Sequence, residues 1–561
     1  MSNRMRMTGI NSGMDTQSII EQLVDVKKTK KEKLKKQQTK LGWKQDSWKT
    51  LNSKIYGLYN EQFGKMRLQG SFSAKKATIA DSSIATVTAD NGAVTGSQSL
   101  KVKQLAATAY VTGAKLEDLH KDPDKTMADM TLADLIEKRV DDNVDAKYKE
   151  IEASGQHWSE AQRLNYYDEQ SALWGKESQF FQVKKDNSDD SSWEEVEIRK
   201  DMTMKQIADA FAATGINASF DASNGRFYFS SKTEGAEGQF QIKSKDMKDV
   251  MGVSDDESTK VDMNSGNWME LLGLNKNVSG SSFIEGQDAE IELNGALYTK
   301  NTNSFSINGL NISVNKVSES ATNISVTNDT DSVYNMIKDF FKKYNEIITE
   351  MDKLYNADSA KDYEPLTSEE KDAMSDDEVE EWETKIKDSL LRRDDNLSKL
   401  ISTLKEGMSK AVTVSSGKTY SLASFGINTL SYFEAADNER GVYHIDGDQD
   451  DEKTKGATDV LKEMLANNLD DTVEFFSKLT SGVYDNLTKQ MARVPEYRSF
   501  QSLYDDKQLQ KEYDNLSTKI KKEEDYLSDY EDKWYDKFAA MEKAMAKVNS
   551  KSDALGGLLG G

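Results

Sequence analysis

Residues 506–548 read DKQLQKEYDNLSTKIKKEEDYLSDYEDKWYDKFAAMEKAMAKV, and this stretch decides the fold. Positions at alternating steps of four and three, with one repeated step of four near the end, are apolar except for Glu523, and this is the spacing of a coiled-coil seam. The predicted seam consists of Leu509, Leu516, Ile520, Leu527, Tyr530, Trp534, Phe538, Met541 and Met545. A long C-terminal helix that packs along a partner helix is therefore predicted.

The N-terminal part of the chain supplies the partner, because the same rhythm begins near Asp15. The apolar positions of this second seam are Ile19, Leu23, Val26, Leu34 and Leu41, and polar residues interrupt it. Two half-polar seams at opposite ends of one chain suggest that the ends meet as a coiled-coil stalk. Gly42 is a weak point in the first helix and a candidate hinge.

Lysines are concentrated on the first helix, with eight of them in residues 27–40. An antiparallel pairing would set these lysines against the acidic residues of 523–532 and fix the orientation of the helices by charge. The sequence also predicts where this N-terminal helix begins. Asp15 is expected to cap it, while Met14 and Ile19 pack as a hydrophobic staple.

The composition limits the classes of function. The chain has 561 residues, enough for three or four domains, and 97 acidic residues against 74 Lys plus Arg give a net charge of -23. This charge disfavours nucleic acid as a partner, so the lysine run is interpreted as a solvated helix face. Cysteine is absent. Neither a membrane span nor a cleaved signal peptide is predicted.

Three Asn-Gly pairs between alternating apolar runs predict β-hairpins at Asn224-Gly225, Asn294-Gly295 and Asn308-Gly309. Broad apolar faces predict helices again after residue 333. The order of helices, strands, an irregular insert, strands and helices indicates nested insertion, and hence an α+β multidomain fold with a terminal coiled-coil stalk, a helical bundle and antiparallel β-rich outer domains. The expected domains are a leg (1–43, 508–561), a bundle (44–76, 327–507), a β-rich plate (77–108, 277–326) and a tip (109–276).

No chemistry of catalysis stands out in the sequence. There is no P-loop, no nucleotide-binding glycine motif and no nucleophile elbow, and the three histidines have no metal-ligand spacing. We therefore expect no enzyme, no cofactor and no metal. Four tryptophans between residues 109 and 276 leave open a glycan-binding adhesin, although scattered tryptophans more often belong to a core or interface: Trp158, Trp174, Trp193 and Trp268.

The opening Gly-Ile-Asn-Ser-Gly-Met-Asp-Thr of residues 9–16 resembles the start of bacterial flagellar filament-cap proteins, the hook-associated protein 2 family. The residues that carry this signature turn are Gly9, Ser12, Gly13, Asp15 and Thr16. Further matches extend the resemblance over about residues 8–108 and 283–550, whereas 109–276 shares only a faint hairpin.

The resemblance implies a structural assembly factor. Similar proteins leave the cell through the flagellar export channel without a cleaved signal, form a homo-oligomeric ring at the distal filament tip, and promote folding and insertion of flagellin. The implied partners are a second copy, flagellin, the hook-filament junction protein, an export chaperone and, in some relatives, host mucin glycans. Another flagellar axial protein, such as a junction protein or a flagellin, is the alternative.

Overall fold

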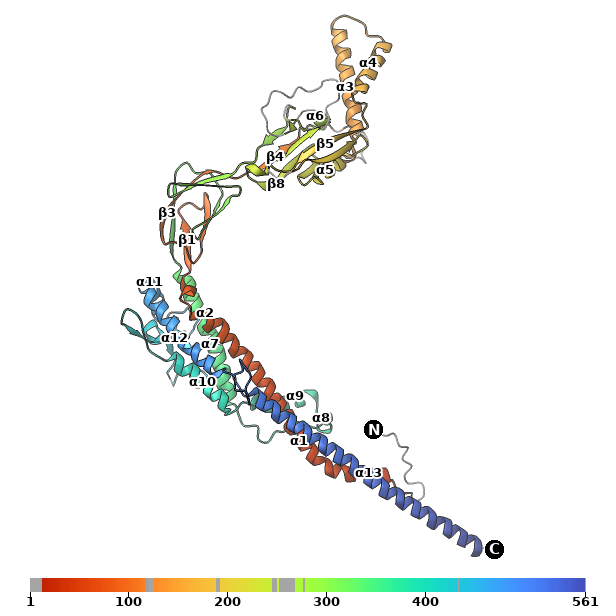
Figure 1. The fold of residues 1–561 in the computed structure, drawn as a ribbon, viewed down its shortest axis with the longest axis vertical. Coiled ribbons are helices and arrows are strands. Elements are labelled where there is room, and N and C mark those ends of the chain that lie inside the picture. The colour runs from red at the N-terminus through yellow and green to blue at the C-terminus, as the bar shows by residue number, and fades with distance from the viewer. Residues whose placement is uncertain are drawn as a thin grey trace. The chain divides into compact units, whose positions relative to one another are not determined.

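The structure, a computed structural model, describes residues 13–117, 119, 126–187, 192–244, 250–251, 268–275, 278–431 and 433–559. The chain divides into two compact units (Figure 1). One unit combines residues 1–74 with 329–561, and the other is residues 75–328. The chain therefore leaves the first unit once and returns to it, as nested insertion requires, and the predicted fold class is confirmed.

The first unit is helical. Its longest elements are α1 (Thr16–Gly57), α7 (Thr330–Asn356), α10 (Asp395–Met408), α12 (Leu469–Gln490) and α13 (Asp506–Leu559). Shorter elements complete it: the π-helix η1 (Leu58–Phe63), α2 (Gly64–Met66), η2 (Gln69–Phe72), α8 (Ser368–Asp372), α9 (Asp376–Asp388), β17 (Val412–Thr413), β18 (Thr419–Tyr420), η5 (Leu422–Phe425), β19 (Ile427–Thr429), β20 (Tyr443–Ile445) and α11 (Val460–Asn467).

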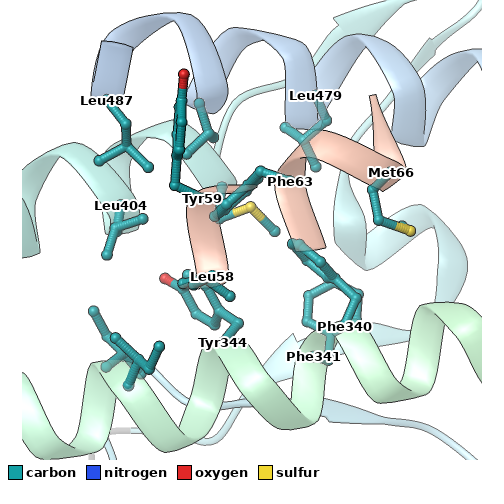
Figure 2. Close-up of a cluster of buried hydrophobic side chains, with 14 of the residues drawn as sticks. Leu58, Tyr59, Phe63, Met66, Phe340, Phe341, Tyr344, Leu404, Leu479 and Leu487 are labelled. Atoms are coloured by element: carbon teal, nitrogen blue, oxygen red, sulfur yellow. The ribbon is translucent and has the colours of Figure 1, made fainter. Parts of the chain in front are cut away.

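A bundle of α1, η1, α7, α10 and α12 holds the core of this unit. Figure 2 shows Tyr59 and Phe63 between Phe340 of α7 and Leu479 of α12. The ring of Phe63 meets that of Phe340 edge-on, with centroids 5.1 Å apart. Phe63 and Phe340 are both fully buried, so this contact lies at the centre of the bundle.

The π-helix η1 lies within this core. Its residues Leu58, Tyr59 and Phe63 are all buried. A π turn adds one residue to the helical repeat, so two consecutive side chains, Leu58 and Tyr59, can both face the core. Steps of three and four in the sequence do not predict such a turn, and the π-helix was not expected.

A β-sandwich forms the first part of the second unit. Its eight antiparallel strands are β1 (Lys75–Ile79), β2 (Ala85–Ala89), β3 (Gly96–Gln104), β12 (Ala289–Leu293), β13 (Ala296–Lys300), β14 (Ser304–Ile307), β15 (Leu310–Val314) and β16 (Thr322–Asn328). One sheet has the order β1-β16-β3-β12-β13 and the other β14-β15-β2. The predicted hairpins at Asn294-Gly295 and Asn308-Gly309 are confirmed, because all four residues have positive φ and join paired strands.

Two further four-stranded sheets, in the orders β11-β4-β8-β7 and β10-β9-β5-β6, share a second core with α3 and α5. Their elements are β4 (Thr108–Thr112), η3 (Met127–Asp129), α3 (Leu132–Ala153), α4 (Glu160–Leu173), β5 (Ser178–Lys184), β6 (Glu194–Arg199), α5 (Met204–Ala212), β7 (Asn217–Asp221), β8 (Arg226–Glu234), η4 (Ala236–Gly238), β9 (Gln241–Ser244), β10 (Val250–Met251), α6 (Trp268–Leu271) and β11 (Ser282–Ile284). Strands β7 and β8 pair as predicted, around a turn in which Asp221 accepts from the backbone of Ser223 and Asn224.

Candidate assembly surface: the terminal stalk

Helices α1 and α13 lie side by side and antiparallel (Figure 1). Three polar contacts fix their register: Lys30 with Glu523, Gln38 Nε2 donating to Ser517 Oγ at 2.5 Å, and Gln45 Nε2 donating to Gln510 Oε1 at 3.4 Å. Residue numbers on α13 therefore fall as those on α1 rise, as in an antiparallel pair of helices. The two ends of the chain meet in one stalk, as the paired seams predicted.

The tip of the stalk has its own apolar cluster, separate from the bundle core. It contains the buried residues Ile20, Val24 and Leu527, with Tyr530, Trp534, Tyr535 and Phe538 packed against them. The rings of Tyr530, Trp534 and Phe538 follow one another along α13, with centroids 6.2 Å and 6.0 Å apart. This cluster is small, and between Val24 and Trp48 no residue of α1 is buried, over a stretch that the structure describes throughout.

The seam predicted on α13 agrees with the exposure of its residues. Ile520 and Leu527 are buried, and the other positions are half-buried: Leu509, Leu516, Tyr530, Trp534, Phe538, Met541 and Met545. On α1, Leu23, Leu34 and Leu41 are half-buried as well. The role of these residues in assembly remains a prediction.

The register predicted for the first turns of α1 needs a correction. Ile19 is 38% exposed and Val26 is 74% exposed, whereas Ile20 and Val24 are buried against α13. The sequence has adjacent apolar pairs here, and successive residues of a helix lie about 100° apart around its axis. Periodicity alone could not decide between Ile19 and Ile20, and a contact face that passes through Ile20 and Val24 leaves Val26 pointing away from it.

Charge pairing along the stalk follows the predicted pattern at two positions. Lys30 contacts Glu523, and Lys35 Nζ lies 3.3 Å from Glu524 Oε1. Both lysines are largely exposed. Exposed ion pairs contribute roughly 0–1 kcal/mol each, so these contacts select orientation and register more than they stabilise the stalk.

The base of the stalk is anchored more firmly than its tip. Trp48 is 1% exposed and stacks on Tyr504 with ring centroids 5.1 Å apart. The Oδ1 of Asn52 accepts from the backbone N–H of Leu503 at 2.8 Å, and Lys44 Nζ lies 2.8 Å from Asp394 Oδ2. The three/four spacing of the N-terminal seam includes Lys44 and Trp48, whereas it gives no signal for Asn52 or for the partner residues Asp394, Leu503 and Tyr504.

The signature turn lies partly outside the described residues, since Gly9 and Ser12 precede residue 13. Gly13 has φ +65°, which favours glycine, and the Asp15 carboxylate accepts from the backbone N–H of Ser18 at 3.0 Å. The predicted N-cap is thus confirmed, and Thr16 is buried beside it. Gly42 lies inside the continuous helix α1, and its role as a hinge remains a prediction.

Metal sites, membrane-spanning helices and exposed tryptophans are features that other classes of function would use. The described residues hold no group of three potential metal ligands among His, Cys, Asp and Glu, and none of their helices is long and apolar enough to cross a membrane. Trp174 and Trp268 are 7% and 1% exposed, so they belong to the second core and cannot stack on a glycan. For these two residues the structure bears out the core position that scattered tryptophans more often have, whereas Trp158 and Trp193 are half-buried, and the adhesin alternative remains untested.

Comparison with protein families identifies the chain. The family model of the flagellar hook-associated protein 2 N-terminus matches residues 12–109, and that of the C-terminus matches residues 286–550. This chain belongs to the flagellar hook-associated protein 2 family. Together the two family models cover both arms of the stalk, the bundle and the β-sandwich, and they leave residues 110–285 unmatched.

A flagellar hook-associated protein 2 of Halalkalibacterium halodurans is 24% identical over 503 residues, which is 87% of this chain and 83% of that protein. Among solved structures, the D1-D2-D3 domains of the Escherichia coli flagellar cap protein FliD match with a TM-score of 0.45 at 16% identity, covering 80% of this chain and 96% of that one. The D2-D3 domains of the Serratia marcescens protein match with a TM-score of 0.27 at 14% identity, covering 44% and 100%.

Proposed function

We propose that this hook-associated protein 2 caps the distal end of the bacterial flagellar filament, where it oligomerises as a ring and promotes the folding and insertion of exported flagellin. In this role it lies outside the cell and is exported without a cleaved signal peptide. Its partners are a second copy, flagellin, the hook-filament junction protein and, before export, a chaperone.

The sparse packing of the stalk carries the proposal. Long helices need an amphipathic face buried in tertiary contacts to be stable, and α1 buries only Thr16, Ile20 and Val24 before it reaches Trp48. A stalk held by a small apolar cluster and by exposed polar contacts opens at low free-energy cost. It can therefore release and remake contacts each time a flagellin subunit is inserted.

The four-part division of the chain assigns the remaining tasks. The leg (1–43, 508–561) contacts flagellin, the bundle (44–76, 327–507) contacts neighbouring copies, and the plate (77–108, 277–326) with the tip (109–276) covers the growing end. In this mechanism the protein acts by confining exported flagellin under the plate and tip until it folds, and it makes or breaks no covalent bond.

A deletion of residues 1–42 tests the leg assignment. The shortened protein keeps Trp48 and the bundle, so we expect it to fold and oligomerise but to lose flagellin into the medium instead of extending filaments. The measurement is filament length by electron microscopy together with flagellin in the supernatant. Normal filament growth on this variant would refute the assignment.

A pair of point variants tests the packing of the stalk without deleting any residue. Leu527→Asp places a charge in the apolar cluster at the stalk tip, whereas Val26→Asp places one at an exposed position of α1. We expect only Leu527→Asp to reduce filament length. Equal effects of the two would show that charge, and not packing, matters.

A further inference from the structure

Helices α8 and α9, with the turn between them, form a helical hairpin (residues 367–388) that lies beside α1 (Figure 1). A capping box begins each helix, with Glu370 reaching back to Thr367 and Glu378 to Ser375. Ile386 is the single buried residue of this hairpin, which the structure describes throughout. One buried apolar side chain gives little packing energy, so the position of the hairpin depends on its polar contacts.

Contacts with α1 come from both helices of the hairpin. The Nζ of Lys36 donates to both carboxylate oxygens of Glu370 in α8, at 3.1 and 2.9 Å. The Nζ of Lys387 in α9 lies 4.8 Å from the ring centroid of Trp43. The Lys36 side chain is only 19% exposed, so its ion pair is less solvated than those formed by the lysines farther out on the stalk. Partial desolvation strengthens an ion pair and a cation–π contact alike.

A carboxylate inside the hairpin couples these two contacts. Glu383, whose side chain is 12% exposed, lies 2.6 Å from the Nζ of Lys371 and 3.1 Å from that of Lys387. Lys371 is the neighbour of Glu370 in α8, and Lys387 is the residue that covers Trp43 in α9. The charged groups therefore form one network, and α8 and α9 hold α1 as a single piece.

The chain that leaves the hairpin is fixed to the bundle. Asp394 caps α10, accepting from the backbone N–H of Asn396 at 3.0 Å, and it also lies 2.8 Å from the Nζ of Lys44. The hairpin thus connects the bundle to residues 36–44 of α1, within the stretch that buries no residue before Trp48. Lys36 is about 18 Å along the helix from Trp48, so a contact there resists tilting of the stalk about its base.

We propose that the α8–α9 hairpin is a brace, sensitive to ionic strength, that fixes the direction of the stalk relative to the bundle. The stalk keeps one direction while the hairpin holds Lys36 and Trp43. When salt screens the charged contacts, the hairpin detaches and the stalk swings about the anchored Trp48. The proposal concerns contacts within the first unit and does not depend on the role in filament growth.

Spin labels on the full-length chain test whether the hairpin detaches, because the natural sequence has no cysteine to remove. Thr39→Cys on α1 and Thr384→Cys on α9 carry the labels at exposed positions, and double electron–electron resonance measures their distance distribution. The test variant is Glu370→Gln with Lys387→Gln. Glutamine keeps the capping box at residue 370, while the charges of both contacts with α1 are lost.

The control variant is Glu381→Gln with Lys385→Gln, which removes an exposed ion pair of 3.0 Å within α9. Both double variants leave the net charge unchanged. We expect the detached population, seen as a longer distance, to rise about tenfold in the test variant, which corresponds to about 1.4 kcal/mol, and to stay unchanged in the control. Equal populations in the two variants would overturn the proposal.

A second pair of labels, at Lys27→Cys on α1 and Asp485→Cys on α12, reports the direction of the stalk. Lys27 is about 50 Å along the helix from Tyr59, whose ring stacks on that of Tyr484. We expect a broader distance distribution in the test variant than in the control variant. In the natural chain, salt raised from about 0.01 M to about 1 M shortens the Debye length from about 30 to about 3 Å and should broaden the distribution in the same way. Detachment of the hairpin without this broadening would refute the brace.

A third pair of labels separates tilting of the stalk from its opening. Lys27→Cys and Ser528→Cys lie on α1 and α13, at exposed positions near the tip of the stalk. Their distance distribution should be the same in the natural chain and in the test variant, because the brace contacts neither residue. A broader distribution for this pair in the test variant would show that the stalk itself opens and would overturn the proposal.

Discussion

Leu527→Ala is the sharpest test of how the stalk is held. Leu527 is 7% exposed and packs with Ile20 and Val24. Replacing a buried leucine by alanine costs roughly 2–5 kcal/mol, and an interface of only two helices can relax, so we expect about 2 kcal/mol. Since 1.4 kcal/mol is about tenfold, local opening of the stalk should increase about thirtyfold.

Hydrogen exchange followed by mass spectrometry measures this opening segment by segment. Peptides from residues 20–34 and 520–538 should exchange about thirtyfold faster, while peptides from the bundle core on α7 and α12 keep their protection, because Leu527 is not part of that core. Val26→Ala, at an exposed position of α1, is the matched control and should change little. Equally faster hydrogen exchange in the stalk and in the bundle would refute the conclusion that the two open independently. Equal effects of Leu527→Ala and Val26→Ala would refute the conclusion that packing of Leu527 holds the stalk together.

Three further outcomes follow from the structure. Phe63→Ala, which empties a fully buried position on the π-helix, should destabilise the bundle by about 3–5 kcal/mol in thermal or denaturant unfolding, and a loss below 1 kcal/mol would contradict its central place. Gly309→Ala should lower the melting temperature of the second unit, because φ is +79° and an added Cβ would lie 2.9 Å from the backbone nitrogen of Ala93; an unchanged melting temperature would contradict this strain. Lys478 and Ser415 lower the pKa of Glu474 to about 2, below its value of about 4.3 in unfolded chains. The stabilising effect of the Glu474 carboxylate is therefore present above about pH 4.3 and is lost as the pH falls toward 2. In urea unfolding, the stability of Glu474→Gln should depend less on pH in this window than that of the natural chain, and an identical pH dependence would contradict the assignment.

The sequence predicted the structure best at positions where neighbouring residues alone determine the backbone conformation. Asn308 and Gly309 both need positive φ, and an Asn-Gly pair between alternating strands meets that need at low cost. The cap at Asp15 is equally local, since a carboxylate two or three residues before an N–H suffices. The seam in the first half of α13 was readable because Leu509, Leu516 and Ile520 have no apolar residue beside them in the sequence.

Features that depend on packing between segments far apart in the chain could not be predicted from the sequence. Ile19 and Ile20 are chemically identical, and only the position of α13 decides that Ile20 is buried. The π-helix from Leu58 to Phe63 similarly depends on the facing residues of α7 and α12. Trp174 and Trp268 lie in a core to which β4, β5, β6 and β9 also contribute, and sequence analysis did not predict these four strands.

The chain enters and leaves the inserted unit through neighbouring positions. Lys75 of β1 pairs with Asn328 of β16, and the backbone N–H of Asp329 donates to the carbonyl of Ala74 at 2.8 Å. Only two adjacent chain ends would thus need rejoining if the whole span between them were exchanged. A span whose two ends lie side by side in this way can be replaced as one piece while the residues on either side of it keep their contacts.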